Sequence, residues 1–110
     1  MDSNLVVRAL SALAHESRLA IFRSLVVAGP EGIAAGEIAQ QLGLSPSSLS
    51  FHLKDLSHAE LVKARQEGRF IFYSANFEAM NELIGFLTEN CCAGADCSLP
   101  ASPQCCGDNP

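Results

Sequence analysis

Residues 44–74 read LSPSSLSFHLKDLSHAELVKARQEGRFIFYS and predict a helix with a well-marked beginning, followed by two short strands. Ser45 has the side chain of a helix N-cap, and Pro46 follows at the first helical position, where a missing N–H removes no helical hydrogen bond. Apolar side chains then recur at positions i, i+4 and i+7, on one inward face: Leu49, Leu53 and Leu56. The segment therefore predicts an amphipathic helix with a polar outer face.

Two strands are predicted directly after this helix, at residues 61–66 and 69–75, with Glu67-Gly68 as the turn of a hairpin. Before the helix, Gly43-Leu44 joins it to a shorter helix predicted at residues 35–41, and such a pair has the form of a helix-turn-helix. A hairpin that follows the second helix of the pair fits a wing. We therefore expect a mainly α fold with a β-hairpin wing, an α+β fold of the winged helix-turn-helix kind.

The remaining segments predict three more helices and a tail. Apolar spacing predicts the first helix at residues 4–14 and the last from Phe77 to about Asn90, and Ser17 is expected to cap the second helix, which ends before Gly29-Pro30. Gly, Pro, Ser and Asp dominate the last residues, where regular structure is not expected. We expect one folded domain over residues 1–92 and a flexible tail over 93–110.

The composition excludes several classes of protein. A chain of 110 residues with 48% hydrophobic residues fits one domain with a hydrophobic core. No apolar run approaches the ~20 residues of a membrane helix, and the first residues lack the pattern of a secretory signal. We therefore expect a cytoplasmic protein without membrane contact. The sequence also shows no nucleophile–base pair, phosphate loop or partnered carboxylates that would indicate an enzyme or a permanent cofactor.

The net charge of -5 is unevenly distributed along the chain. All seven basic residues lie within residues 1–75, together with seven acidic residues, whereas residues 76–110 hold five acidic and no basic residues. The first part is neutral overall, so the acidic total does not count against nucleic-acid binding there.

The outer face of the helix that begins at Pro46 carries groups suited to DNA. Steps of about 100° per residue from the inward leucines place five side chains outward: Ser47, Ser50, Phe51, Lys54 and His58. Hydroxyls can hydrogen-bond base edges or phosphates, a lysine can neutralise a phosphate, and an aromatic ring can contact a thymine methyl group. A polar outer face alone fits any amphipathic helix, but the hairpin adds three more cations, which makes DNA the more specific interpretation: Lys63, Arg65 and Arg69.

These segments resemble the ArsR/SmtB family of winged-helix repressors. Residues 44–56 are similar to the family's recognition helix, residues 61–74 to its wing, and residues 10–18 to the junction of its first two helices. The resemblance spans about residues 5–90 and implies a homodimeric repressor of double-stranded operator DNA, joined through its first and last helices.

The DNA-binding residues that we predict are Ser47, Ser48, Ser50, Phe51, His52, Lys54, Lys63, Arg65 and Arg69. Phe51 departs from the polar residue common at its position, and Glu60 departs from the glycine that usually follows the helix. A positive φ at Glu60 would carry strain. The three histidines share no ligand spacing, so surface or packing roles fit them better than metal binding.

All five cysteines lie at the C-terminal end: Cys91, Cys92, Cys97, Cys105 and Cys106. An odd number in an expected cytoplasmic chain is a poor disulfide framework and favours thiols for a metal, a metalloid or redox chemistry. Thiolates select soft or borderline ions.

Two metal sites of the family have no counterpart here, because residues 32–39 hold no thiol and the predicted last helix holds no histidine. Asn90-Cys91-Cys92 instead resembles the arsenic-responsive subgroup. This resemblance implies As(III) or Sb(III) as the inducer, bound by Cys91, Cys92 and Cys97. Closing the loop to Cys105 is only ~0.9 kcal/mol less favourable than closing it to Cys97, so Cys105 and Cys106 stay open as the third ligand.

Alternatives remain open for the thiols. Four thiolates suit Zn²⁺ or Cd²⁺, and a disulfide between the two cysteine groups suits a redox-sensing repressor. A thiol-rich metalloid buffer would need no DNA-binding face, and the tail could also have no role.

Overall fold

Within residues 2–91, which the computed structural model describes, the chain forms five helices and three strands. In chain order these are α1 (Ser3–Leu13), α2 (Glu16–Ala28), β1 (Ile33–Ala34), α3 (Ala35–Leu42), α4 (Pro46–His58), β2 (Val62–Glu67), β3 (Phe70–Ala75) and α5 (Phe77–Leu87). The expected α+β architecture with a hairpin wing is confirmed. The tail predicted at 93–110 lies outside the described residues, as do Cys92, Cys97, Cys105 and Cys106.

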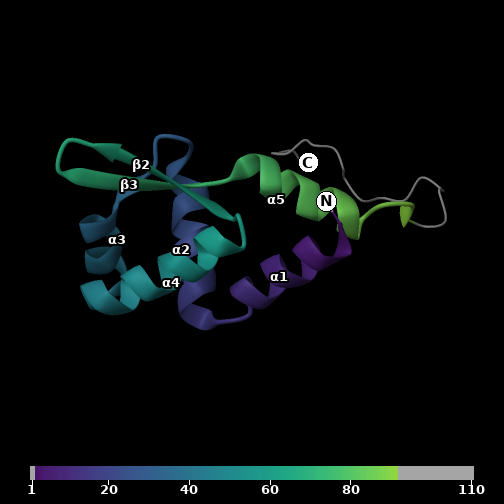
Figure 1. Ribbon diagram of the computed structural model, residues 1–110, viewed down its shortest axis with the longest axis horizontal. Coiled ribbons are helices and arrows are strands. Elements are labelled where there is room, and N and C mark those ends of the chain that lie inside the picture. Colours follow the sequence, from purple (N-terminus) through teal and green to yellow (C-terminus); the bar gives the residue numbers. More distant parts are fainter. Residues whose placement is uncertain (1, 92–110) are drawn as a thin grey trace, which may run out of the picture.

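The elements divide between two ends of the molecule, which Figure 1 shows on the left and on the right. The β2–β3 hairpin, α3 and α4 lie at one end, whereas α1 and α5 lie at the other and contact each other. α2 lies between them and packs against α1, α3, α4 and β3. No helix within residues 2–91 combines the length and the apolar character that crossing a membrane would require.

The hydrophobic core lies where α2, α3, α4 and the start of β2 meet. Its largest fully buried side chains are Ile21, Leu25, Ile38, Leu56 and Leu61. The predicted inward face of α4 is confirmed, since Leu49, Leu53 and Leu56 are each at most 2% exposed. Burial of these leucines fixes which face of α4 remains outside.

The three strands form one antiparallel sheet in the order β1-β3-β2. β1 was not predicted, because two residues are too few to show a strand period. Ile33 pairs with Tyr73, and Gly32 just before it approaches the same residue closely: a Cβ on Gly32 would lie 2.5 Å from the Tyr73 carbonyl oxygen. Glycine is therefore needed for β1 to reach β3.

The hairpin turn differs from the prediction by one residue. Glu67 pairs with Phe70, so the turn is Gly68-Arg69 and not Glu67-Gly68. Gly68 has a φ of +62°, and a two-residue hairpin turn requires a positive φ at its first central position. The correction moves Arg69 from the strand to the tip of the wing.

Two helix ends also differ from the predictions. Ser17 does not cap α2; His15 does, because its Nδ1 accepts a hydrogen bond from the Ser17 N–H at 3.1 Å. α5 ends at Leu87 and not near Asn90, which has a φ of +57°. Glu60 has a φ of +64°, so the strained conformation considered from the sequence is present.

Candidate nucleic-acid interface

The first turn of α4 presents hydroxyl groups at the surface. The Ser45 side chain caps the helix as predicted, with its Oγ accepting from the Ser48 N–H at 3.2 Å. Pro46 follows as the first helical residue. Because the cap fixes this turn, Ser47, Ser48 and Ser50 are all exposed near the helix N-terminus.

Further along, the outer face of α4 carries one cation and one exposed aromatic ring. Lys54 is exposed, and the Phe51 side chain is 60% exposed although it is apolar. His58 is exposed at the end of the helix, where its backbone carbonyl accepts from the Arg8 guanidinium at 3.5 Å. The outer face can therefore offer hydroxyls, one charge and one apolar contact to a ligand.

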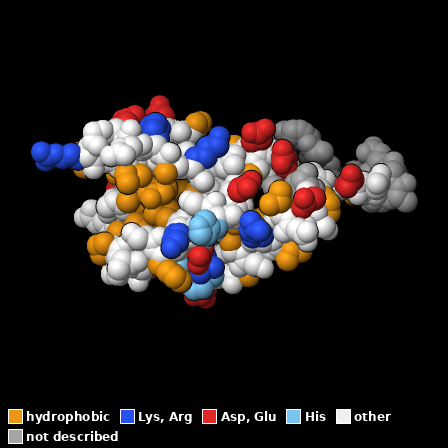
Figure 2. Space-filling view, viewed as in Figure 1, with side chains coloured by type: hydrophobic (Ala, Val, Ile, Leu, Met, Phe, Trp, Pro, Cys, Tyr) orange, Lys and Arg blue, Asp and Glu red, His pale blue; other side chains and the backbone are white. Residues whose placement is uncertain are grey.

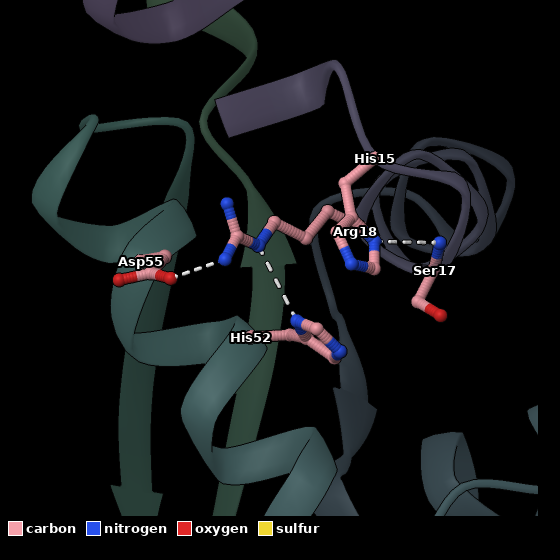
Figure 3. A network of polar contacts seen from close by, with 5 residues as sticks. All are labelled: His15, Ser17, Arg18, His52 and Asp55. Carbon is pink, nitrogen blue, oxygen red and sulfur yellow. Dashed lines mark hydrogen bonds and ion pairs between the residues drawn. The ribbon is translucent and has the colours of Figure 1, made fainter. Parts of the chain in front are cut away.

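His52 points away from this outer face, toward α2 (Figure 3). It is half-buried, and its Nδ1 accepts a hydrogen bond from Arg18 Nε at 3.3 Å. The other side of the Arg18 guanidinium forms an ion pair with Asp55, one turn further along α4. One arginine of α2 thus holds two successive positions of α4.

Aromatic contacts extend this cluster in both directions. The His15 ring lies 4.8 Å from that of His52, centroid to centroid, and Phe51 meets His52 edge-on at 5.9 Å. Burial lowers the pKa of His52 below its ordinary value, the positive charges of His15 and Arg18 lower it further, and Asp55 opposes the change. Sequence reasoning missed the roles of Arg18 and Asp55, because the contacts of Arg18 join residues 34 and 37 positions apart.

The hairpin places its cations on one exposed face. Lys63, Arg65 and Glu67 alternate along β2 opposite Ser74, Phe72 and Phe70 of β3. Arg65 is already engaged: its Nε donates to Glu67 at 2.8 Å, and its guanidinium carbon lies 5.2 Å from the centre of the Phe72 ring.

Arg69 is exposed at the tip of the wing, and Lys63 is exposed near its base. Figure 2 shows a cationic side chain projecting from the hairpin end, whereas acidic side chains gather over the end that carries α5. The described residues therefore place a cationic, hydroxyl-bearing surface at one end of the molecule.

The opposite end exposes apolar side chains. Five large ones on α1 and α5 are between 38% and 61% exposed: Val7, Leu10, Ile84, Phe86 and Leu87. We call these five residues the α1/α5 apolar face. Exposure of so many large apolar side chains on two adjacent helices is typical of a surface that another protein covers.

Cys91 lies four residues after Leu87, the last residue of α5. It is half-buried, and its N–H donates to the Thr88 carbonyl at 3.0 Å. Among residues 2–91 no three His, Cys, Asp or Glu side chains are grouped closely enough to hold a metal ion. A thiolate site at Cys91 would therefore need the cysteines that follow it in the sequence.

Comparisons with known proteins place this geometry in a family. A helix-turn-helix domain model matches residues 13–65. The nodulation protein NolR of Rhizobium meliloti is 38% identical over 88 residues, which make up 80% of this chain and 70% of that protein. A Halobacterium salinarum protein assigned as an arsenical resistance operon repressor, ArsR, is 40% identical over 67 residues, or 61% of this chain and 51% of that protein.

A solved structure from Mycobacterium bovis is similar to most of this chain. It is described as the homodimeric winged helix-turn-helix DNA-binding domain of a possible ArsR-family transcriptional regulator. The two chains superpose with a TM-score of 0.64 at 30% sequence identity, over 77% of this chain and 76% of that one.

Proposed function

This chain belongs to the winged helix-turn-helix transcriptional regulators of the ArsR type, and on that basis we propose that it is a dimeric repressor released from DNA by As(III) or Sb(III). The observation that carries the proposal is that the two ends of the molecule differ in chemistry. A hydroxyl-bearing and cationic surface lies at the α4 end, and the sequence after α5, at the other end, holds all five cysteines.

α4 is the helix that we place in the major groove. Exposed Ser47 and Ser50 near its N-terminus are within the part of a recognition helix that reaches base edges. Lys54 and Arg69 are suited to phosphates on either side of the groove. Phe51 supplies an apolar contact for a thymine methyl group.

The α1/α5 apolar face is the surface that we assign to a second copy of the chain. A two-fold dimer presents two recognition helices about one DNA turn, roughly 34 Å, apart, which suits a palindromic operator. The homodimeric description of the M. bovis relative supports this arrangement.

The effector is assigned to the thiols that begin at Cys91. As(III) and Sb(III) are soft and take three thiolate ligands, which Cys91, Cys92 and Cys97 can supply, with Cys105 or Cys106 as the alternative third ligand. Arsenite and antimonite are As(OH)3 and Sb(OH)3 near neutral pH, so three bonds to sulfur replace three bonds to oxygen and each thiol proton leaves with a hydroxide as water. Binding is therefore expected to vary little with pH near neutrality.

A hydrogen-bonded link supports communication between the two ends. Asn76 caps α5 by accepting from the Ala79 N–H at 3.2 Å. The same side chain donates to the Glu60 carbonyl at 2.9 Å, just beyond the end of α4. A displacement of α5 by a ligand at its C-terminal end would therefore bear on the segment that follows the recognition helix.

Fluorescence anisotropy tests the proposal. The probe is a labelled duplex that the wild-type chain selects from a random-sequence pool, and binding is measured at fixed salt in a thiol-free reductant. We expect arsenite to weaken wild-type binding by more than about a hundredfold, which corresponds to a coupling of ~3 kcal/mol. The double variant Cys91→Ser/Cys92→Ser is expected to bind the duplex normally and to ignore arsenite.

Cys105→Ser/Cys106→Ser is expected to respond like the wild type where Cys97 is the third ligand. A response lost in this variant would assign the third ligand to Cys105 or Cys106. A response to Zn²⁺, Cd²⁺ or peroxide but not to arsenite would contradict the metalloid assignment and favour a thiolate-metal or redox regulator. Failure to select any duplex, with arsenite still bound, would favour a metalloid buffer.

A further inference from the structure

We propose that Arg18 and His52 are positioning residues for the recognition helix, and that protonation of His52 weakens DNA binding by loosening their contact. The inference rests on the proposed function, since it assigns the DNA-binding role to α4. It removes His52 from the set of direct DNA contacts predicted from the sequence and gives it a role behind the DNA-binding surface.

The geometry shows how one side chain orients α4. Arg18 lies on α2, and its side chain is 18% exposed. Its guanidinium reaches His52 through Nε and Asp55 through a terminal nitrogen, and these two positions are three residues apart on α4. Two fixed points on one helix face restrain the rotation of the helix about its axis, in addition to the packing of its leucines.

The same contact reaches the DNA-binding surface through Phe51. The Phe51 ring meets the His52 ring edge-on at 5.9 Å, although Phe51 is 60% exposed. An exposed aromatic ring has few contacts to hold its orientation, and His52 provides one of them. A change at His52 therefore affects both the rotation of α4 and the ring that we assign to a thymine methyl group.

The contact requires neutral His52. Its Nδ1 accepts the hydrogen bond from Arg18, so in the neutral form the ring proton is on Nε2. Protonation turns Nδ1 into a donor that faces another donor, and it places a positive charge beside Arg18. The contact between α2 and α4 is therefore present above the pKa of His52 and is lost below it.

Two of the three charged groups that act on His52 favour its neutral form. From α2 and its cap, His15 and Arg18 lower the pKa of His52, while Asp55 on α4 raises it. His15 also caps α2, because its Nδ1 accepts a hydrogen bond from the Ser17 N–H. On the other elements packed against α4, Arg8 donates to the His58 carbonyl and Arg65 pairs with Glu67. Glu37 lines a pocket beside α2, and Lys63 is exposed on β2.

The expected pH dependence of DNA binding is opposite to the one that charge alone would give. Added positive charge on a protein ordinarily strengthens DNA binding, because more phosphates are neutralised. Here we expect affinity for the selected duplex to fall by about tenfold as the pH is lowered from neutrality to well below the ordinary histidine pKa of about 6.5. The fall should lie on the acidic side of the ordinary histidine pKa, because burial lowers that of His52.

The test measures affinity for the selected duplex against pH and against salt. His52→Asn keeps an acceptor near the position of Nδ1 but does not titrate, so we expect it to bind within about threefold of the wild type at neutral pH and to lose most of the pH dependence. His58→Gln removes the exposed histidine of the same helix. A pH dependence that persists in His58→Gln and disappears in His52→Asn assigns the titration to His52. Arg18→Gln should bind about tenfold more weakly with an unchanged salt slope, because no phosphate contact is removed.

A second measurement is independent of DNA. In NMR spectra of the full chain, the Arg18 Nε–H should be protected from exchange at neutral pH, and its signal should be lost as His52 titrates. This measurement tests the contact between Arg18 and His52 even if Arg18→Gln fails to fold. An Nε–H signal that ignores the His52 titration overturns the proposal. A His52→Asn profile identical to that of the wild type, or a lower salt slope for Arg18→Gln, also overturns the positioning role while leaving DNA binding in place. A chain that selects no duplex at any pH overturns the proposed function and the positioning role together.

Discussion

The two helices α4 and α5 begin in the same way and differ in what they leave outside. A side chain caps each of them, Ser45 for α4 and Asn76 for α5, and each cap accepts from the N–H three residues later at 3.2 Å. α4 buries three leucines on its inner face, and α5 buries Ala79 and Leu83. The outer face of α4 carries hydroxyls and Lys54, whereas that of α5 carries large apolar side chains.

In both helices the inner face stabilises the fold. We assign DNA binding to the outer face of α4 and dimerisation to the outer face of α5. A polar, cationic face binds a polyanion with salt-dependent affinity, and an apolar face excludes water against another protein. The predictions below alter one face at a time, so that each can break or sharpen this assignment.

The largest effect is expected for Ile84→Glu on α5. A carboxylate at a position that a partner chain covers is costly to desolvate, so we expect a monomer in sedimentation experiments. DNA affinity should fall on the order of a hundredfold, because two recognition helices no longer bind together. Val27→Glu is the control, since Val27 is 83% exposed on α2, outside the α1/α5 apolar face. An Ile84→Glu chain that remains dimeric would remove α5 from the interface.

A smaller effect is expected for Arg69→Ala at the tip of the wing. Loss of one phosphate contact should reduce the salt slope of binding by about one and weaken binding roughly tenfold at moderate salt. Arg23→Ala on α2, also at an exposed arginine, should change neither quantity. Equal slopes for the wild type and Arg69→Ala would show that the wing tip does not reach DNA.

Phe51 is expected to contribute less, and at particular bases only. Replacing each thymine of the selected duplex in turn by uracil removes one methyl group, and at the contacted base this should cost the wild type about fourfold, or ~0.8 kcal/mol. Phe51→Ala should bind the thymine and uracil duplexes equally. If every uracil duplex binds the wild type as tightly as the parent, then Phe51 has no thymine contact.

The smallest change is expected for Glu60→Gly, which lies between the two ends. Glu60 has a φ of +64°, which disfavours residues with a side chain, and glycine relieves this strain. We expect the free energy of unfolding to rise by about 0.5–1 kcal/mol in urea denaturation, with DNA affinity unchanged. Glu60→Ala removes the same carboxylate but keeps the Cβ, so it should give no gain. An equal gain for both variants would point to the charge and not to the backbone.

Features set by neighbouring residues could be predicted from the sequence. Ser45 and Pro46 mark the start of α4, and the leucine spacing correctly gives its inner face. The predictions fail where a contact between distant segments of the chain determines the local structure. β1 exists because Gly32 permits an approach to Tyr73, forty-one positions away in the chain, and no local period marks two residues as a strand.

In the candidate site, too, the features set by local geometry could be predicted and those set by distant residues could not. Outward exposure of Ser47, Ser50, Phe51 and Lys54 follows from helical geometry and could be predicted. The inward turn of His52 could not, because it depends on Arg18 of another helix. Ser17 was expected to cap α2 because serine is a common cap, but His15 occupies that role with a ring nitrogen.

The most direct test is whether DNA and arsenite weaken each other's binding by the same factor. Isothermal titration calorimetry of arsenite, in a thiol-free reductant, would be run on the free chain and on its complex with the selected duplex. Linkage requires DNA to weaken arsenite binding by the same factor by which arsenite weakens DNA binding, more than about a hundredfold here. Equal arsenite affinities for the free chain and the complex would contradict the claim that thiols beyond α5 control the DNA-binding surface of α4.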